Sequence, residues 1–226
     1  MTDETLDVGP TFQKIPGPWK RYSDGPLRNQ LIPNSWSSPE LEVTASIPGW
    51  TMTEKMDGTN IRVHHDGFSV SFGGRTNKAQ IPLPLANYLS ATFHSELFEQ
   101  QFGETPVTVY GEGIGPKIQA GGGLYGPVRV VIFDVRIGDM WLLRPDVEDI
   151  ADALGVEVAP IELEGVTLHD GIAAVRAGIM STVAAQHGNE KEAEGLVATL
   201  ATGLRDRRGS RLITKIKACD FPKENS

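Results

Sequence analysis

The sequence predicts a mixed α+β domain rather than a doubly wound one, and three observations lead to this fold class. Several short segments alternate apolar and polar residues, as half-buried strands do, and others repeat apolar residues at helical spacing. The two kinds of segment follow no repeating βαβ order. Neither Gly-x-Gly-x-x-Gly nor Gly-x-x-x-x-Gly-Lys-Ser/Thr occurs, which argues against Rossmann and P-loop folds.

Composition is that of an ordinary globular protein. At 226 residues, with 39% hydrophobic and 22% charged residues, the chain can build one substantial domain. The acidic amino terminus lacks the apolar run of a signal peptide, and no apolar stretch approaches the length of a membrane span. The single cysteine, Cys219, rules out an internal disulfide and suits a reducing compartment. We therefore expect a cytoplasmic protein with no membrane segment.

The first fifty residues differ in composition from the rest. They hold seven of the fifteen prolines together with Trp19, Trp36 and Trp50. Proline interrupts regular structure, whereas tryptophans indicate packing. We expect residues 1–50 to form an irregular lead-in packed on a domain of residues 51–226.

The first regular elements after the lead-in are a hairpin and a helix. Residues 59–64 and 68–72 alternate apolar and polar side chains around Asp66-Gly67, a typical turn pair. The pair His64-His65 shows no metal-ligand spacing, and we expect it at the hairpin tip. Apolar residues near helical spacing then predict a helix over residues 85–102.

Two later helices have recognisable ends. Arg144-Pro145 opens a helix that Gly155 ends, because proline suits the first turn and glycine the position after the last. Gly178 closes a second helix that begins at Leu168. Apolar and β-branched runs predict the remaining strands over residues 107–110, 128–135, 196–198 and 211–216.

The most informative motif is Glu54-Lys55-Met56-Asp57-Gly58-Thr59-Asn60. A lysine can attack the α-phosphate of a nucleoside triphosphate and carry the nucleotide as a phosphoramidate. That chemistry needs a nearby carboxylate, a glycine that lets the substrate approach the backbone, and further cations. Because Lys-x-Asp-Gly arises by chance in roughly one chain in twenty of this length, its weight depends on partners elsewhere.

The downstream sequence supplies candidate partners. Glu112 and Glu194 each precede a glycine at the end or start of a predicted strand, where a ligand can approach closely. Lys215 and Lys217 alternate on a strand, so both project from one face and attract an anion such as a triphosphate. Both would also lower the pKa of a third lysine. Taken singly, Glu-Gly pairs are common in turns, and alternating lysines also protect sheet edges.

The net charge of −8 argues mildly against a protein that coats nucleic acid. Residues 205–223, however, carry a local charge of +5, and the rest of the chain carries −13. A solvated surface and a grip on nucleic-acid phosphates both account for such a run. Its position beside Lys215 and Lys217 favours the grip, with Arg205, Arg207 and Arg208 as the contacts.

This ordered set resembles the covalent nucleotidyltransferase superfamily of polynucleotide ligases and mRNA capping enzymes, most closely its RNA ligase 2-like group. Lys55-Met56-Asp57-Gly58 is similar to the first motif, and Thr59-Asn60 completes the form found in that group. DNA ligases usually have arginine where this chain has Asn60. Arg75 stands 20 residues after the lysine, where the group has its phosphate-binding arginine. The third motif falls on Glu112, and Phe133-Asp134 resembles the strand that follows it. Glu194 to Val197 resembles the fourth motif and Lys215-Ile216-Lys217 the fifth.

The resemblance implies a ligase adenylylation fold of antiparallel sheets flanked by helices around a nucleotide groove. It implies an ATP-dependent RNA ligase that works through lysyl-AMP on Lys55 and seals 5′-phosphate and 3′-hydroxyl ends in RNA repair. Magnesium or manganese would be bound by Glu194, and Lys215 and Lys217 would neutralise phosphoryl charge. The nucleotide-binding residues implied are Glu54, Asp57, Gly58, Asn60, Arg75 (phosphate), Glu112 (ribose), Phe133 (adenine), Glu194, Lys215 and Lys217.

The sequence ends within ten residues of Lys217. We therefore expect a minimal ligase with no OB-fold or helical carboxy-terminal domain, in which residues 1–50 take over part of substrate docking. The expected partners are RNA ends, nicked or single-stranded, with DNA as an alternative and no obligate protein partner. A DNA nick ligase, a capping guanylyltransferase and a non-catalytic nucleotide- or RNA-binding homologue remain the alternatives.

Overall fold

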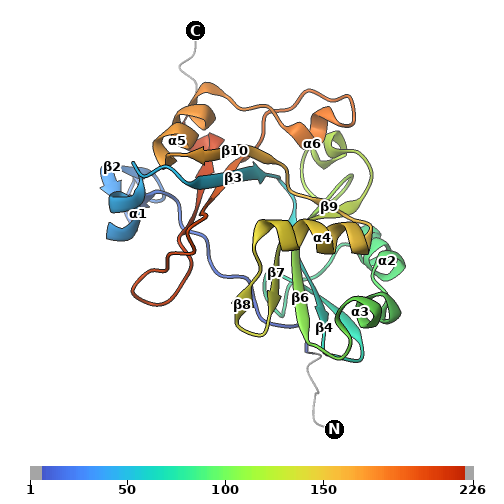
Figure 1. The fold of residues 1–226 in the computed structure, drawn as a ribbon. Helices are drawn as coiled ribbons and strands as arrows, with labels where there is room; N and C mark the ends of the chain where they lie inside the picture. The colour runs from blue at the N-terminus through green and yellow to red at the C-terminus, as the bar shows by residue number, and fades with distance from the viewer. Residues whose placement is uncertain (1–6, 222–226) are drawn as a thin grey trace. The chain divides into compact units, whose positions relative to one another are not determined.

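The computed structural model describes residues 7–221, and within them the chain divides into two compact units. Unit 1 contains residues 7–13 and Asp57–Ala159, and unit 2 contains residues Lys14–Met56 and 160–221. The predicted lead-in and domain extend beyond this range by residues 1–6 and 222–226, which lie outside the described residues. No helix in the described range is long and apolar enough to cross a membrane. Helices and predominantly antiparallel sheets confirm the predicted α+β class (Figure 1).

Unit 1 is built on one sheet with strand order β5-β4-β6-β7-β8, in which all neighbours are antiparallel. A short sixth strand, β9, pairs in parallel with β7. The strands are β4 (Thr59–His65), β5 (Val70–Gly74), β6 (Val107–Ile114), β7 (Arg129–Ile137), β8 (Met140–Trp141) and β9 (Glu157–Val158).

The helices of unit 1 are α2 (Leu83–Thr92), α3 (Ser95–Phe102) and α4 (Arg144–Leu154), with a short 3-10 helix η1 (Gly122–Tyr125). Their apolar faces share one core with β4, β6 and β7. The prediction of a single helix over residues 85–102 is wrong, because Phe93 is extended and separates α2 from α3. A continuous helix would turn Phe93 and Phe98 about 140° apart. The break lets both rings enter the same core, 6.2 Å apart.

The predicted hairpin is confirmed as β4 and β5, with Asp66 accepting backbone hydrogen bonds from Phe68 and Ser69. The placement of His64-His65 at its tip is wrong. Both side chains are buried within β4, and the His64 ring nitrogen Nδ1 lies 2.9 Å from the hydroxyl of Thr108. Both histidines are therefore part of the packed sheet.

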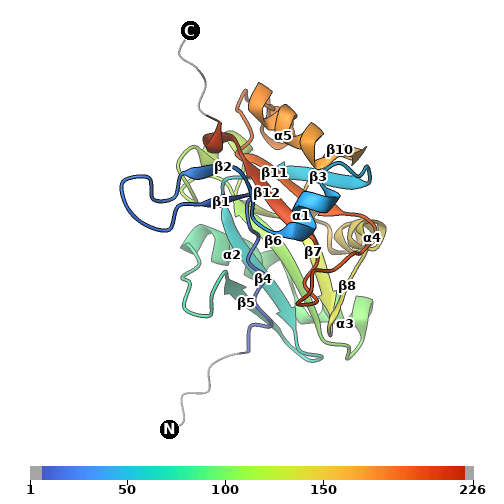
Figure 2. The same ribbon diagram turned by 90° about the vertical axis from the view of Figure 1, so that its left-hand side faces the viewer.

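Unit 2 is built on a four-stranded antiparallel sheet with the order β10-β3-β11-β12. Its core gathers apolar residues from this sheet and from α1 and α5, and α5 is seen along the sheet in Figure 2. The strands are β3 (Trp50–Lys55), β10 (Ile161–Val166), β11 (Gly195–Leu200) and β12 (Ile213–Lys217), and the helices are α1 (Pro39–Thr44), α5 (Leu168–Ala177), α6 (Thr182–Ala185) and the 3-10 helix η2 (Ala218–Asp220).

The expectation of an irregular lead-in is wrong in part. Residues 14–50 contain α1 and a two-stranded sheet of β1 (Trp19–Arg21) and β2 (Leu31–Trp36). Trp19 and Trp36 pair across this sheet with ring centroids 6.0 Å apart and pack against the core of unit 2. The contact between the two tryptophans stabilises these strands. The strands were not predicted, because prolines interrupt the sequence pattern of this segment.

The two helices predicted from their ends are confirmed. Helix α4 has Pro145 in its first turn and Gly155 after its last, with Gly155 in the left-handed conformation. Helix α5 is capped by the Thr167 hydroxyl, which accepts from the backbone N–H of Asp170, and Gly178 follows its last turn. Proline thus marked the start of α4 correctly, and glycine marked the ends of both helices.

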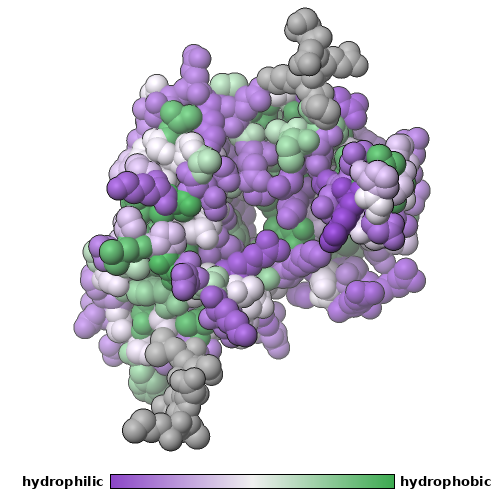
Figure 3. All heavy atoms as spheres, turned by 180° about the vertical axis from the view of Figure 1, so that it is seen from behind, coloured by the Kyte–Doolittle hydropathy of each residue, from purple (hydrophilic) through white to green (hydrophobic). Residues whose placement is uncertain are grey.

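Hydrophilic residues predominate on the face of the molecule shown in Figure 3. Hydrophobic residues appear there in smaller, separate areas, and no broad apolar area of described residues is visible on this face. That face is typical of a surface in contact with water.

Candidate active site

Three predicted site residues meet in unit 2. The carboxylate of Glu194 accepts a hydrogen bond from Lys55 Nζ at 2.6 Å and lies 3.1 Å from Lys217 Nζ. The strand register explains the meeting, because Gly195, the first residue of β11, is the partner of Lys55 on β3 and of Lys217 on β12. A carboxylate that precedes Gly195 thus lies between the two lysines.

Only glycine fits after this carboxylate. Gly195 has φ +146°, and a Cβ there would lie 1.9 Å from the carbonyl oxygen of Ile216. The missing side chain lets β11 and β12 approach closely at the point where Glu194 leaves the sheet. The Glu-Gly pair seen in the sequence therefore has a structural reason.

The three charges stabilise one another. Burial raises the pKa of Glu194, but the hydrogen bonds and charges of Lys55 and Lys217 outweigh it and hold that pKa below its ordinary value. Burial lowers the pKa of Lys217, and the hydrogen bond and charge of Glu194 outweigh it, so that pKa is raised. The side chains of Lys55, Glu194 and Lys217 are 20%, 24% and 31% exposed, so solvent screens them only partly.

The predicted face of Lys215 and Lys217 is confirmed. Both alternate with buried Ile216 on β12, and Lys215 pairs in register with Val197. Lys215 lies two residues before Lys217 on the strand, so both side chains project from the same face. Unit 2 therefore presents a row of three lysines and one carboxylate on a single sheet face.

Glu54 points to the opposite face from Lys55 and is 2% exposed. One carboxylate oxygen accepts from the hydroxyl of Ser181 at 2.5 Å and the other from the backbone N–H of Val183 at 3.0 Å. Burial raises the pKa of Glu54 against the effect of these hydrogen bonds. Within unit 2 the carboxylate joins the end of β3 to the start of α6.

The motif continues into unit 1 through the turn between β3 and β4. The backbone N–H of Asp57 donates to the hydroxyl of Tyr125 at 3.0 Å. A Cβ on Gly58 would lie 2.4 Å from the carbonyl oxygen of Gly113, so this turn packs directly against β6. Gln119 donates to the carbonyl of Gly58 at 3.3 Å, which adds a further restraint.

Asn60 and Glu112 are direct cross-strand partners on β4 and β6, so their side chains lie side by side on one face. The Oδ1 atom of Asn60 is buried and has no hydrogen-bond partner within the described part of the chain. A buried polar atom without a partner is costly unless a ligand satisfies it. The pair is therefore suited to binding a polar ligand.

Phe133 lies at a break in the ladder between β6 and β7. Tyr110 pairs with Asp134 and Gly111 with Ile132, which leaves Phe133 as the extra residue of a bulge. Bulges re-aim a side chain. The ring of Phe133 is half-buried and meets the ring of Phe12 edge-on, with centroids 5.1 Å apart.

The predicted arginines are exposed. Arg75 follows the last residue of β5. Arg205, Arg207 and Arg208 lie in the connection between β11 and β12 and form, with Gly209, the basic tip. Arg207 Nε lies 3.2 Å from Glu40 of α1, yet the Arg207 side chain is 83% exposed. Such a pair contributes little to stability and leaves the arginine accessible.

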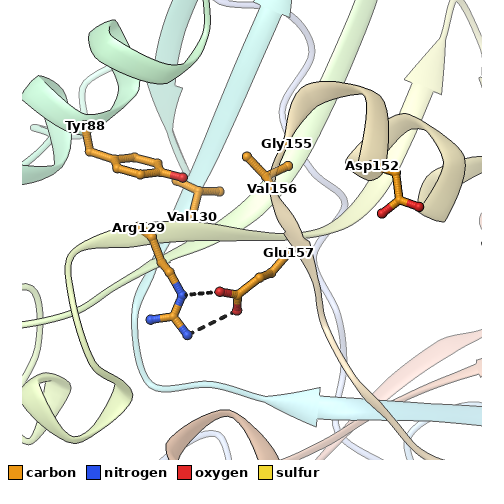
Figure 4. A pocket seen from close by; sticks show the side chains of 7 residues that line it. All are labelled: Tyr88, Arg129, Val130, Asp152, Gly155, Val156 and Glu157. Carbon is orange, nitrogen blue, oxygen red and sulfur yellow. Dashed lines mark hydrogen bonds and ion pairs between the residues drawn. The ribbon is translucent and has the colours of Figure 1, made fainter. Parts of the chain in front are cut away.

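Unit 1 also contains a cavity of about 420 Å³ lined by none of the predicted site residues. Glu157 accepts two hydrogen bonds from Arg129 at its edge, at 2.9 and 3.1 Å (Figure 4). The residues that line it are Tyr88, Arg129, Val130, Asp152, Gly155, Val156 and Glu157. Its paired charges are satisfied within the protein.

Sequence reasoning missed three residues that hold the site. Tyr125 fixes Asp57, Ser181 fixes Glu54, and Phe12 contacts Phe133. A serine before Thr182 is a typical helix-capping signal, and Ser181 does cap α6. Tyr125 and Phe12 have no local signal, because their partners are distant in the sequence.

The donor atoms suit a metal ion that arrives with its substrate. Within residues 7–221, no three His, Cys, Asp or Glu side chains are grouped to hold a metal. Magnesium, however, is commonly held by one or two carboxylates together with substrate phosphates and water. Glu194 offers one such carboxylate, so the residues fit a magnesium ion shared with a nucleotide.

Solved structures of Naegleria gruberi RNA ligase are similar to this chain. An apo mutant aligns with a TM-score of 0.59 at 20% identity, over 81% of this chain and 53% of its own. A mutant with ATP and Mn aligns with a TM-score of 0.61 at 16% identity, over 94% of this chain and 57% of that one. A further mutant with ATP and Mn reaches 0.60 at 17% identity, covering 92% and 60%. This chain thus spans little more than half the length of those proteins.

At these identities the structural likeness shows the fold, which this chain shares with those structures and which confirms the predicted fold class. No curated protein matches the sequence. The profile of the RNA ligase family matches residues 48–217, which is well over half of the chain and includes every motif from Lys55 to Lys217. The chain therefore belongs to the RNA ligase family.

Proposed function

We propose that this protein is an ATP-dependent RNA ligase that works through a lysyl-AMP intermediate. The observation that carries the proposal is the cluster in which Lys55 and Lys217 share the carboxylate of Glu194, in a chain of the RNA ligase family. The cluster places a candidate nucleophile next to the groups that balance phosphoryl charge.

The reaction has three steps. Lys55 Nζ, having lost a proton, attacks the α-phosphorus of ATP, and the bond from phosphorus to pyrophosphate breaks as the N–P bond forms. The 5′-phosphate of an RNA end then attacks the lysyl-AMP, which transfers the adenylyl group and frees Lys55. A 3′-hydroxyl finally attacks the activated 5′-phosphate and displaces AMP, which seals the strand.

The nucleotide-recognition roles fall on unit 1. The unpartnered Oδ1 of Asn60 beside Glu112 supports hydrogen bonding to the ribose and its surroundings. The partly exposed ring of Phe133 supports stacking on adenine. Asp57 and Gly58 shape the turn that follows Lys55, and the exposed guanidinium of Arg75 contacts phosphate.

Phosphate chemistry falls on unit 2. Lys215 and Lys217 neutralise charge on the phosphoryl oxygens, because both project from the face that carries Lys55. Glu194 would hold magnesium through its carboxylate. The ion, when bound, withdraws electron density from the phosphate oxygens.

Glu54 contributes through position, because both of its carboxylate oxygens are engaged by the start of α6. A direct contact of Glu54 with nucleotide stays a prediction.

Residues 51–226 form the catalytic domain in this proposal, and residues 1–50 support it. The family profile, which starts at residue 48, supports that boundary. The cytoplasmic location also stays a prediction.

The substrates proposed are RNA ends, with the basic tip gripping the backbone near the junction. Its exposed arginines support this role. Sealing of matched nicks with RNA or DNA on the 3′-hydroxyl side separates an RNA ligase from a DNA nick ligase. Labelling by ATP but not GTP separates it from a capping guanylyltransferase.

Covalent labelling tests the proposal. The wild-type protein is incubated with α-labelled ATP and magnesium and then separated by denaturing electrophoresis. We expect a labelled band that is lost in Lys55→Ala and kept in Lys78→Ala, which removes an exposed lysine of unit 1. No wild-type label under any metal condition, or undiminished label in folded Lys55→Ala, would falsify the assignment.

A further inference from the structure

The segment of residues 7–13 is fixed on the sheet of unit 1 although it is no part of that sheet. The buried guanidinium of Arg62 donates to the carbonyl of Gly9 at 2.5 Å, and the Tyr110 hydroxyl donates to the carbonyl of Pro10 at 2.8 Å. Gly9 has φ +71°, and a Cβ there would lie 2.7 Å from the ring of His64. The segment therefore has one position, set by groups buried in the sheet.

These anchors place the ring of Phe12 in an aromatic cluster. Phe12 meets Phe133, Tyr110 and Trp141 edge-on, with centroids 5.1, 5.1 and 5.3 Å apart. Tyr110 and Trp141 also contact each other at 5.3 Å. Edge-to-face contacts fix the plane of a ring as well as its position.

The cluster lies on the sheet face that carries the proposed nucleotide residues. Asn60 and Arg62 alternate on β4 and thus share a face, and their register partners are Glu112 and Tyr110. Phe133 reaches this face from its bulge, because its ring meets Phe12, which in turn packs on Tyr110.

We propose that Phe12 is a positioning residue that fixes the plane of Phe133 for stacking on the nucleotide base. This inference rests on the proposed function, in which Phe133 binds adenine. A ring on a bulge has few ladder restraints, and its outer torsion is broad. Phe12 removes that freedom before the nucleotide arrives, so binding does not have to order the ring.

The expected signature lies in nucleotide affinity. Loss of the Phe12 edge leaves the Lys55 chemistry in place, so kcat for adenylation changes little while KM for ATP rises. An edge-to-face pair corresponds to a change of roughly 3- to 10-fold in KM. Removing the stacking ring itself, in Phe133→Ala, should raise KM by roughly 10-fold or more.

A double-mutant cycle on self-adenylation tests the inference. Wild type, Phe12→Ala, Phe133→Ala and the double variant are compared for KM and kcat with ATP, after circular dichroism confirms folding. Phe68→Ala is the matched control, because Phe68 is 79% exposed and outside the cluster. Phe12→Leu keeps an apolar side chain without an aromatic edge, and it replaces Phe12→Ala in the cycle if that variant unfolds.

If Phe12 acts through Phe133, the double variant has the KM of Phe133→Ala within about 2-fold, since coupled residues are not additive. The inference is overturned if the two effects multiply, or if the Phe12 variant behaves like Phe68→Ala while Phe133→Ala is impaired. In both of those cases the wild-type protein is still labelled covalently by ATP, so the proposed function is not contradicted. A wild-type protein that is never labelled removes the proposed function, and this inference with it.

Discussion

Replacing Glu194 by glutamine should destabilise unit 2, because it removes the one negative charge shared by two lysines. Glutamine keeps the shape of the side chain, so packing changes little. Lys55 and Lys217, whose nitrogens lie 2.6 and 3.1 Å from the carboxylate, would then face each other across a neutral amide. The perturbation is therefore electrostatic rather than steric.

The magnitude follows from the contacts and the burial. A hydrogen bond to a charged group contributes about 1.5–3 kcal/mol to stability. The amide oxygen of glutamine still accepts one such bond, and the partly buried carboxylate no longer has to be desolvated. We expect a net loss of about 1–3 kcal/mol in the free energy of unfolding. For a chain of this size that corresponds to a fall in Tm of roughly 2–12 °C.

The dependence on pH has a definite sign. The pKa of Glu194 is lowered in the folded state, so its contribution is present above the unfolded value of about 4.3 and is lost as pH falls through the folded value. The pKa of Lys217 is raised, so its contribution is present below about 10.4 and is lost as pH rises through the folded value. The gap between wild type and Glu194→Gln should therefore be widest between about pH 5 and 10.

Thermal and urea unfolding across a pH series measures this gap. Glu164→Gln serves as the control, because Glu164 is an exposed carboxylate on β10 of the same unit. A Glu194→Gln variant that unfolds at the wild-type midpoint at pH 7 would exclude a stabilising role of the Glu194 charge. A gap that stays constant from pH 7 down to pH 3 would exclude it as well.

Three further outcomes are expected. Glu194→Ala should raise the magnesium requirement of adenylation by about 10-fold or more, whereas Glu112→Ala should raise mainly the ATP requirement; equal effects in both titrations contradict these roles. Ser181→Ala removes a hydrogen bond to buried Glu54 and the cap of α6, so urea unfolding should show a loss of about 1–2 kcal/mol in the free energy of unfolding. An unchanged urea midpoint would contradict this stabilising role of Ser181. Replacing the three arginines of the basic tip by serine should flatten the salt dependence of sealing pre-adenylated RNA by up to about three units of log–log slope. Adenylation of Lys55 should persist in this variant. An unchanged salt slope would show that the basic tip makes no contact with the nucleic-acid backbone.

Local patterns were sufficient for elements whose ends carry their own signals. The hairpin of β4 and β5 follows from alternation around Asp66-Gly67, α4 from Pro145 and Gly155 at its ends, and the end of α5 from Gly178. These signals act over a few residues of backbone, so they operate before any tertiary contact forms. The ordered motifs likewise indicated the RNA ligase family, because residue types and spacing are properties of the chain itself.

Elements without such signals were decided by packing. The break between α2 and α3 places Phe93 and Phe98 in one core. No proline or glycine marks this break in the sequence. Burial of His64 and His65 in β4 depends on strands that lie on either side of it in the sheet. Proline-rich residues 14–50 form strands because Trp19 and Trp36 meet across them.

Residue types and spacing alone indicated the candidates for chemistry, namely a lysine in Lys-x-Asp-Gly, two Glu-Gly pairs and two alternating lysines. The contacts among these residues depend on the folded chain. Glu194 is 139 residues from Lys55 in the chain, and they meet because β11 pairs with both β3 and β12 at Gly195. Likewise, the contact of Phe12 with Phe133 depends on anchors from Arg62 and Tyr110. Periodicity encodes which face a side chain occupies, whereas strand register decides which distant side chains share that face.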